Sequence, residues 1–262
     1  MLFALSTFEL AVGLFVVIGG SAVAGVAVGG FLRESKHNVK ESSGVLQGAL
    51  LGFMGLVLAF GLSLALGRYE SRRAAVVDDA NTIGTAYLRA QSLAEPMRSR
   101  SLSLLERYAD TEIELTHVVP GSAASRRTVA EGSALQRPLW TEAVRAVQQE
   151  PQATAPRLYE DSLNDMIDQQ TVRVAGLSNR VPTEVLLLEV LGAGLAMFLL
   201  GLHVGVLGRS YLPVLLAAGL VSALLFVTFD LDRPTRGRIT ISDTPLTSLR
   251  SSMDQPPAAG GP

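Results

Sequence analysis

The sequence predicts an all-α integral membrane protein with four transmembrane helices, arranged as two pairs on either side of a central helical region. Charged residues make up only 18% of the 262 residues, against roughly 25% in soluble domains. They are also unevenly distributed, because 29 of them lie between Arg68 and Arg180. Long uncharged stretches outside this region account for the deficit.

Four uncharged stretches are long enough to cross a bilayer. An α-helix needs about 20 apolar residues to span roughly 30 Å of hydrocarbon. Buried helices of soluble proteins are usually shorter and amphipathic, so membrane helices are favoured here. The expected helices are residues 10–32 and 44–67, which make the first pair within residues 1–67, and residues 184–207 and 210–230, which make the second pair within residues 182–232.

Basic residues beside the spans predict the orientation, because Lys and Arg concentrate on the cytoplasmic side. Four spans place both termini and the central region on one side of the membrane. That side has more basic residues close to the spans, so both termini and the central region are expected in the cytoplasm, with the protein in the cell inner (plasma) membrane. The residues on that side are Arg68, Arg72, Arg73, Arg173, Arg180, Arg233, Arg236 and Arg238, against Arg33, Lys36, Lys40 and Arg209 on the other.

Residues 68–181 form the predicted cytoplasmic helical domain. No break separates Gly67 from Arg68, so the second span is expected to continue as one long helix that stops before Pro96. The next helix places four residues along one stripe, namely Leu105, Tyr108, Glu112 and Leu115. The other expected elements are helices at residues 97–118, 138–149 and 157–179, and a cytoplasmic tail at residues 233–262, disordered from about 251 because Pro, Gly and Ala dominate it.

No enzyme motif is present. The chain has no cysteine, which excludes a disulfide framework, a thiolate metal site and a Cys-x-x-Cys redox pair. The three histidines, His37, His117 and His203, lack zinc-ligand spacing, and there is no Walker A loop, nucleophile elbow or dinucleotide motif. A formal net charge of −2 argues against nucleic-acid binding. We therefore expect no enzyme activity, no cofactor or metal, and no nucleic-acid partner.

One acidic residue lies inside a predicted span. Glu184 falls in the first helical turn, where the helix dipole favours an acid, but Glu189 lies about 7–8 Å deeper. Acids within the membrane are costly and usually face a partner or a water-filled pathway. Glu189 is therefore expected either to face a water-filled interior or to pair with Arg68 or Arg180.

Two further acids, Asp230 and Asp232, mark the end of the fourth span. Two carboxylates this close could bind a cation, but on a helix they point to different sides. Arg233 follows directly, so pairing with nearby arginines is the favoured interpretation.

One face of the second span carries a glycine followed by two large apolar residues. Gly52, Leu56 and Phe60 have four-residue spacing and so share a helix face. Such a pattern fits close helix packing. It also fits a hydrophobic constriction that gates a pore by dewetting, and periodicity leaves both open. Tight helix contacts are further indicated by glycines of the first span, namely Gly20, Gly25, Gly29 and Gly30.

Two segments resemble the bacterial bestrophin-like membrane proteins, which are related to bestrophin ion channels. In bestrophins a pore-lining phenylalanine precedes an Arg–aromatic pair by eight residues, and Glu-x-Arg follows. Here Phe60 stands before Arg68, Tyr69, Glu70 and Arg72, although a single aromatic precedes the glutamate. The segments are residues 59–89, AFGLSLALGRYESRRAAVVDDANTIGTAYLR, and residues 229–246, FDLDRPTRGRITISDTPL, with the C-terminal signature residues Asp230, Asp232, Arg233 and Pro234.

The resemblance implies a homopentamer in which the second helices surround a central axis. Gly52, Leu56 and Phe60 would form its neck, and Arg68, Glu70 and Arg72 would stabilise the helix where it leaves the membrane. The expected function is an oligomeric ion channel or pore in the lipid bilayer that passes small inorganic ions. The alternative is a non-conducting membrane scaffold or sensor whose helical cytoplasmic domain binds a partner.

Overall fold

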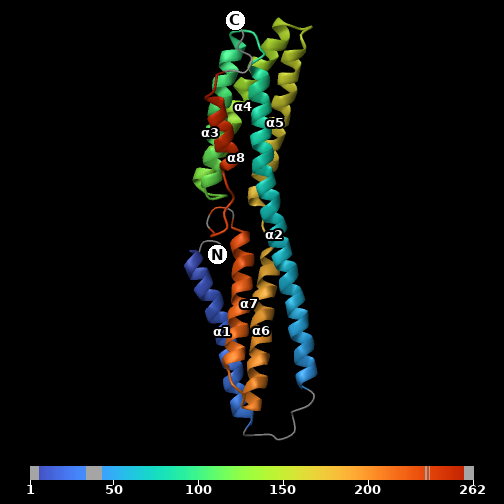
Figure 1. The fold of residues 1–262 in the computed structure, drawn as a ribbon, viewed down its shortest axis with the longest axis vertical. Helices are drawn as coiled ribbons and strands as arrows, with labels where there is room; N and C mark the ends of the chain where they lie inside the picture. Colours follow the sequence, from blue (N-terminus) through green and yellow to red (C-terminus); the bar gives the residue numbers. More distant parts are fainter. Residues whose placement is uncertain (1–5, 34–42, 234, 236, 257–262) are drawn as a thin grey trace. The chain divides into compact units, whose positions relative to one another are not determined.

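The computed structural model of the chain describes residues 6–33, 43–233, 235 and 237–256, without the side chains of residues 43–47. Within this described part the chain is helical, with eight α-helices and no strand (Figure 1). The helices form two compact units, Met1–Arg68 with Arg180–Thr240, and Tyr69–Asn179 with Ile241–Pro262. The all-α fold class is thereby confirmed.

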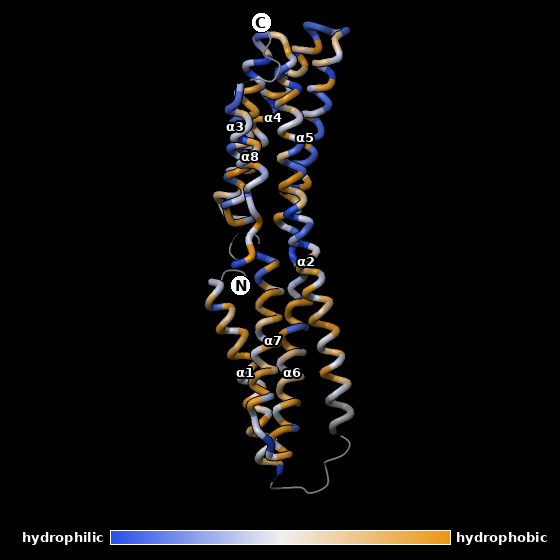
Figure 2. Tube along the Cα trace, in the orientation of Figure 1, coloured by the Kyte–Doolittle hydropathy of each residue, from blue (hydrophilic) through white to orange (hydrophobic). Residues whose placement is uncertain are grey.

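The first unit, here called the membrane unit, contains four helices that are long and apolar enough to cross a membrane. Figure 2 shows that hydrophobic residues predominate along them. They coincide with the four predicted spans. They are α1 (Thr7–Arg33), the first part of α2 (Ser43–Ala90), α6 (Thr183–Leu207) and α7 (Leu212–Leu231), and α2 continues past residue 67 without a break, as the sequence predicts.

Helices α1 and α6 approach each other closely because glycines of each helix face the backbone of the other. A Cβ atom at any of four glycines would overlap a carbonyl oxygen of the opposite helix. Small-xxx-small pairs of this kind let membrane helices pack at short distance. The four are Gly25 and Gly29 on α1, where the added Cβ would lie 2.0 and 2.2 Å from the oxygen, and Gly201 and Gly205 on α6, where it would lie 2.1 and 2.4 Å away.

At the other two glycines expected to make tight contacts on the first span, the side-chain position is open. A Cβ atom at Gly20 or Gly30 would have no described atom within 4 Å other than its own helix backbone and chain neighbours. The side-chain position of each points away from α6, although the backbone nitrogen of Gly30 lies close to Gly205 of α6. Composition indicated that glycines pack closely on this helix, but only the position of α6 decides which ones.

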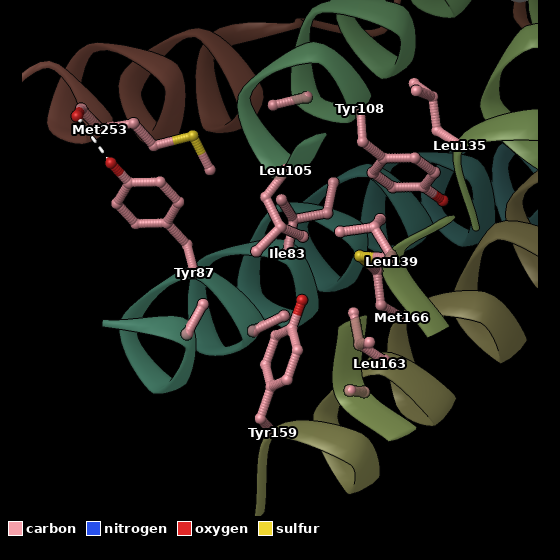
Figure 3. Packing of buried hydrophobic residues seen from close by; sticks show 14 of the residues in the cluster. Ile83, Tyr87, Leu105, Tyr108, Leu135, Leu139, Tyr159, Leu163, Met166 and Met253 are labelled. Carbon is pink, nitrogen blue, oxygen red and sulfur yellow. Dashed lines mark hydrogen bonds between the residues drawn. The ribbon is translucent and has the colours of Figure 1, made fainter. Parts of the chain in front are cut away.

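The second unit, here called the helical bundle, has an apolar core between its helices. Figure 3 shows side chains from different helices pointing toward one another in this core, among them Ile83, Leu105, Tyr108, Leu139 and Tyr159, all fully buried. Burial of this apolar surface is the main stabilising contribution. The helices are the second part of α2, α3 (Met97–His117), α4 (Ala123–Gln149), α5 (Thr154–Ser178) and α8 (Thr244–Met253).

Helix α4 is more than twice as long as the sequence predicted, because it begins at Ala123 and not near Pro138. Ser122 is its N-cap, and the Ser122 side chain accepts a hydrogen bond from the backbone N–H of Ser125 at 3.0 Å. The helix passes through Pro138, although proline there removes one backbone hydrogen bond. The predicted start of this helix at residue 138 is therefore wrong.

The C-terminal tail also differs from its prediction, because α8 extends to Met253 and docks on the helical bundle. Leu246 and Met253 are buried, and the Tyr87 hydroxyl donates a hydrogen bond to the Met253 carbonyl oxygen at 2.9 Å (Figure 3). Disorder from about residue 251 is thus wrong as far as Met253, and residues 257–262 lie outside the described residues. The predicted tail is also divided, since its first residues up to Thr240 belong to the membrane unit.

Candidate functional site

An exposed apolar face of α2 carries the predicted neck residues. Gly52 is exposed, and the side chains of Leu56 and Phe60 are 53% and 62% exposed in the single chain. Successive helix residues are about 100° apart, so Gly61 and Ala65, which are buried, lie on the nearly opposite face. The face that holds Leu56 and Phe60 is therefore free of packing within the described membrane unit.

The opposite face of α2 meets α6 at Glu189. This side chain is fully buried, and its carboxyl group fills the space beside Gly61, where a Cβ atom would lie 1.2 Å from Oε1. Neither carboxyl oxygen has a hydrogen-bond partner among the described residues. In the single chain the carboxyl group therefore has no exposed surface and accepts no hydrogen bond from Arg68 or Arg180.

In the juxtamembrane motif, Arg72 is buried and bonded to the end of α5. Its Nε donates to the carbonyl oxygen of Gly176 at 3.3 Å, and its Nη2 donates to that of Asn179 at 3.0 Å. The last carbonyl groups of a helix lack partners within the helix, and a cation is favourable there. Arg72 therefore fixes the C-terminal end of α5 to α2 within the helical bundle.

The rest of the motif is more accessible. Glu70 pairs with Arg73 one turn further along α2, at 3.5 Å between Oε2 and Nη1, and both side chains are exposed. Such surface pairs contribute little to stability. Arg68 and Tyr69 are half-buried.

The C-terminal signature binds backbone groups. The buried Asp230 carboxylate accepts hydrogen bonds from the backbone N–H of Arg238, at 3.0 and 2.8 Å, and of Ile239, at 2.8 Å. Hydrogen bonds from backbone N–H groups to a carboxylate are charge-assisted and strong. Asp230 therefore orders the segment that follows α7.

The neighbouring signature residues Asp232 and Arg233 are also buried, and they directly follow α7. Asp232 is buried and accepts a hydrogen bond from the backbone N–H of Val181 at 3.1 Å, just before α6 begins. Arg233 is also buried, and Pro234 lies outside the described residues. Among the residues that the structure describes, no group of three or more His, Cys, Asp or Glu could hold a metal ion. The two aspartates thus hold backbone N–H groups, which the sequence spacing did not reveal.

Comparison with known protein families agrees with this architecture. A family model described as "Bestrophin-like domain" matches residues 14–246, which is most of the chain. The chain belongs to the bestrophin-like family. Bestrophin-like proteins are a channel family rather than an enzyme family, so membership supports a channel-like membrane protein.

Solved structures similar to this bestrophin-like chain include several of a bacterial bestrophin homolog from Klebsiella pneumoniae. Two of them, each with one substitution, have 12% and 11% identity and TM-scores of 0.68 and 0.69. The first alignment covers 92% of this chain and 95% of the other, and the second covers 95% and 96%. A third, solved by Zn-SAD phasing, has 13% identity and a TM-score of 0.65, and covers 92% and 94%. At identities this low, the similarity to these structures shows a shared fold alone. A search of curated proteins found no match to the chain.

The bestrophin-like chain also contains a buried polar cluster in its helical bundle, which the sequence analysis did not identify. Arg173 of α5 donates through Nη1 to the carboxylates of Asp79 and Glu112, the latter at 2.8 Å. Its Nη2 donates to the Thr116 hydroxyl at 2.7 Å, and Gln170 donates to Glu112 Oε1 at 2.7 Å. The available signal was the place of Glu112 on the apolar stripe of α3, which indicates burial.

This cluster holds two carboxylates against one guanidinium. Burial and, to a smaller extent, the nearby Asp79 charge raise the pKa of Glu112 to about 7, although Arg173 opposes both effects. Burial likewise raises the pKa of Asp79, with Arg173 opposing. The folded bundle therefore favours a state in which one of the two carboxyl groups carries a proton.

The stability of the helical bundle is expected to fall as the pH rises through neutrality. The pKa of Glu112 is above its ordinary value of 4.5, so its contribution is fully present below pH 4.5 and is lost as the pH passes about 7. The free energy of unfolding is expected to fall by an amount on the order of 3 kcal/mol, because each unit of pKa difference corresponds to about 1.4 kcal/mol. Denaturant unfolding at several pH values, followed by the fluorescence of the single tryptophan, Trp140 on α4, measures it.

Glu112→Gln is expected to flatten this pH dependence, because it removes the titrating group. Glu131→Gln, at an exposed position of α4, is the matched control and should leave the dependence intact. Equal pH dependence in the wild type and in Glu112→Gln would contradict the assignment.

Proposed function

We propose that the chain forms an oligomeric ion channel or pore, in which α2 lines a central hydrophobic neck at Gly52, Leu56 and Phe60. The bestrophin-like family and fold support a channel-like membrane protein. The observation that carries the neck is the exposed face of α2, because Leu56 and Phe60 face outward while the opposite face packs on α6. Other copies of the chain would close this face around an axis.

One polar residue lies close to the proposed neck on the exposed side of α2. Beyond Phe60 the exposed residues are Ser63, Leu64, Leu66 and Gly67, so most of this surface stays apolar. A water-filled passage beside a hydrophobic neck would accommodate the Ser63 hydroxyl group better than lipid would.

In this proposal the assembly is a homopentamer in the cell inner membrane, and small inorganic ions are its cargo. Both termini and the helical bundle lie in the cytoplasm. The stoichiometry is supported by the resemblance to bestrophins, and the orientation by the basic residues beside the spans. The juxtamembrane residues Arg68, Glu70 and Arg72 would stabilise α2 where it leaves the membrane.

Reconstitution tests the proposal directly. Purified protein in liposomes should pass ions, and native mass spectrometry in mild detergent should give one closed oligomer. A monomer would contradict the proposal. A stable oligomer that passes no ions, together with a partner protein cross-linked to the helical bundle, would favour the scaffold or sensor instead.

Phe60→Ala is expected to raise the basal ion flux severalfold. Removing the aromatic ring widens the neck and lowers the dewetting barrier to ions. Flux into liposomes, normalised to the amount of assembled protein, measures the effect.

Leu191→Ala is the matched control, because Leu191 is an equally exposed apolar residue, 63% exposed, on α6. It should leave the flux unchanged. The same increase in both variants would mean that flux reports a general loss of packing, and it would argue against the neck.

A further inference from the structure

Glu189 is an unusual residue of the membrane unit. In the described parts of α1, α6, α7 and the first part of α2, only Glu189 and His203 are ionisable residues that lie away from the first and last helical turns. Glu189 is fully buried, and neither carboxyl oxygen has a hydrogen-bond partner among the described residues. A polar group in this position needs a reason other than fold stability, because an apolar residue would be less costly.

The carboxyl group is part of the contact between α6 and α2. At Gly61 an added Cβ would lie 1.2 Å from Oε1 and 2.3 Å from Cδ of Glu189, so the carboxyl occupies the space of a missing side chain. In a second contact between the two helices the roles are reversed, because α6 supplies the glycine and α2 supplies the side chain. At Gly192 of α6 an added Cβ would lie 2.6 Å from both Sδ and Cε of Met54. The two helices therefore touch at both of these points, and an acid makes one of the two contacts.

No charged group compensates Glu189 in the described membrane unit. On each helix, the ionisable residue nearest to the level of Glu189 lies at a helix end or beyond it. These residues are Glu9 on α1, Arg68 on α2, Glu184 on α6 and Asp230 on α7, and none hydrogen-bonds to Glu189. Two of them have other partners, since Glu9 accepts a hydrogen bond from the Ser6 backbone N–H at 2.7 Å and Asp230 binds backbone N–H groups.

The packed geometry suits the neutral acid and not the carboxylate. An unpaired charge in an apolar site costs several kcal/mol or more, so an ionised Glu189 gains free energy by leaving the space beside Gly61 and reaching water. For the neutral acid, the only cost is that of burying an uncharged polar group without a hydrogen-bond partner. Proton binding at Glu189 and its contact with Gly61 are therefore linked.

We propose that Glu189 is a proton-binding site whose occupancy controls the packing of α6 on α2. The protonated acid holds α2 in place, and loss of the proton releases the contact. The effect on ion flux rests on the proposed channel function. Flux should rise with pH, because α2 carries the neck on its other face. Glu189→Gln keeps the shape of the neutral acid and should give low flux at every pH. Gly61→Ala displaces the carboxyl and should give flux severalfold higher at acidic pH, close to the alkaline wild-type level.

Gly55→Ala is the matched control, since an added Cβ at Gly55 of α2 would have no described atom within 4 Å outside its own helix. It should keep the wild-type pH dependence. Wild-type flux that does not change with pH, or a Glu189→Gln variant that keeps the full pH dependence, would overturn the proposed control of flux.

Infrared spectroscopy tests the proton site without any ion flux. The difference spectrum between wild type and Glu189→Gln should contain the carbonyl stretch of a protonated carboxylic acid at acidic pH. This band should disappear as the pH is raised. A band absent at every pH, or present unchanged at every pH, would overturn the proton site itself. A titrating band in protein that passes no ions would leave the site intact and refute only the channel.

Discussion

Gly25→Ala is expected to lower the free energy of unfolding of the membrane unit by about 1–3 kcal/mol or more, the cost of overpacking a close contact. The added Cβ would lie 2.0 Å from the carbonyl oxygen of Phe198. That atom belongs to the helix backbone and cannot rotate away, so α1 and α6 must separate along the whole contact. Gly201→Ala, on the opposite helix, should have an effect of similar size for the same reason. Thermal unfolding in mild detergent, followed by circular dichroism, measures both.

Helix α1 supplies its own controls. Gly20→Ala and Gly30→Ala change helix propensity in the same way, but an added Cβ at either position meets no described atom of another element. Both variants should be as stable as the wild type, or slightly more stable, because alanine favours helix over glycine. Equal destabilisation at Gly25 and Gly20 would contradict the packing of α1 on α6 described above.

Arg173→Met is expected to destabilise the helical bundle by about 3–5 kcal/mol, the usual cost of breaking a buried ion pair. The substitution leaves Asp79 and Glu112 buried side by side without their cation. Replacing all three residues by apolar ones, with Asp79→Leu, Glu112→Leu and Arg173→Met together, should recover much of the loss, because it also removes the buried charges. Denaturant unfolding followed by Trp140 fluorescence reports on this unit alone, since the chain has one tryptophan.

Arg73→Met is the control for the loss of an arginine ion pair. Arg73 pairs with Glu70 at 3.5 Å, and both side chains are exposed, so the expected loss is below about 1 kcal/mol. If Arg173→Met were as mild as Arg73→Met, the buried cluster would not contribute to the stability of the bundle.

The sequence predicted the membrane helices well because their signal is physical and local. A bilayer demands a fixed length of uncharged helix, and the four stretches could be counted directly. The continuity of α2 through Gly67 and Arg68 followed from the absence of a breaker. The first half of α4 and the whole of α8 were missed for the opposite reason. The buried face of α4 begins with Ser125, Thr128 and Gly132, which have no apolar periodicity, and the short α8 depends on contacts with distant helices.

The candidate site was predictable only in part. Four-residue spacing placed Leu56 and Phe60 on one face of the second span, and the structure leaves that face exposed. The environment of Glu189 could not be derived, because it depends on Gly61, which is far away in the sequence and has no local motif. Asp230 and Asp232 accept hydrogen bonds from backbone N–H groups, and only the fold determines the positions of these groups.

The proposed channel depends on the exposed face of α2, which would line the axis of the oligomer. The most direct test is an electron cryomicroscopy structure of the full chain in lipid nanodiscs, viewed down its symmetry axis. We expect a closed ring in which Leu56 and Phe60 of every copy face the axis and form its narrowest apolar segment. Single chains in the nanodisc, or a ring in which Leu56 and Phe60 face lipid, would contradict it.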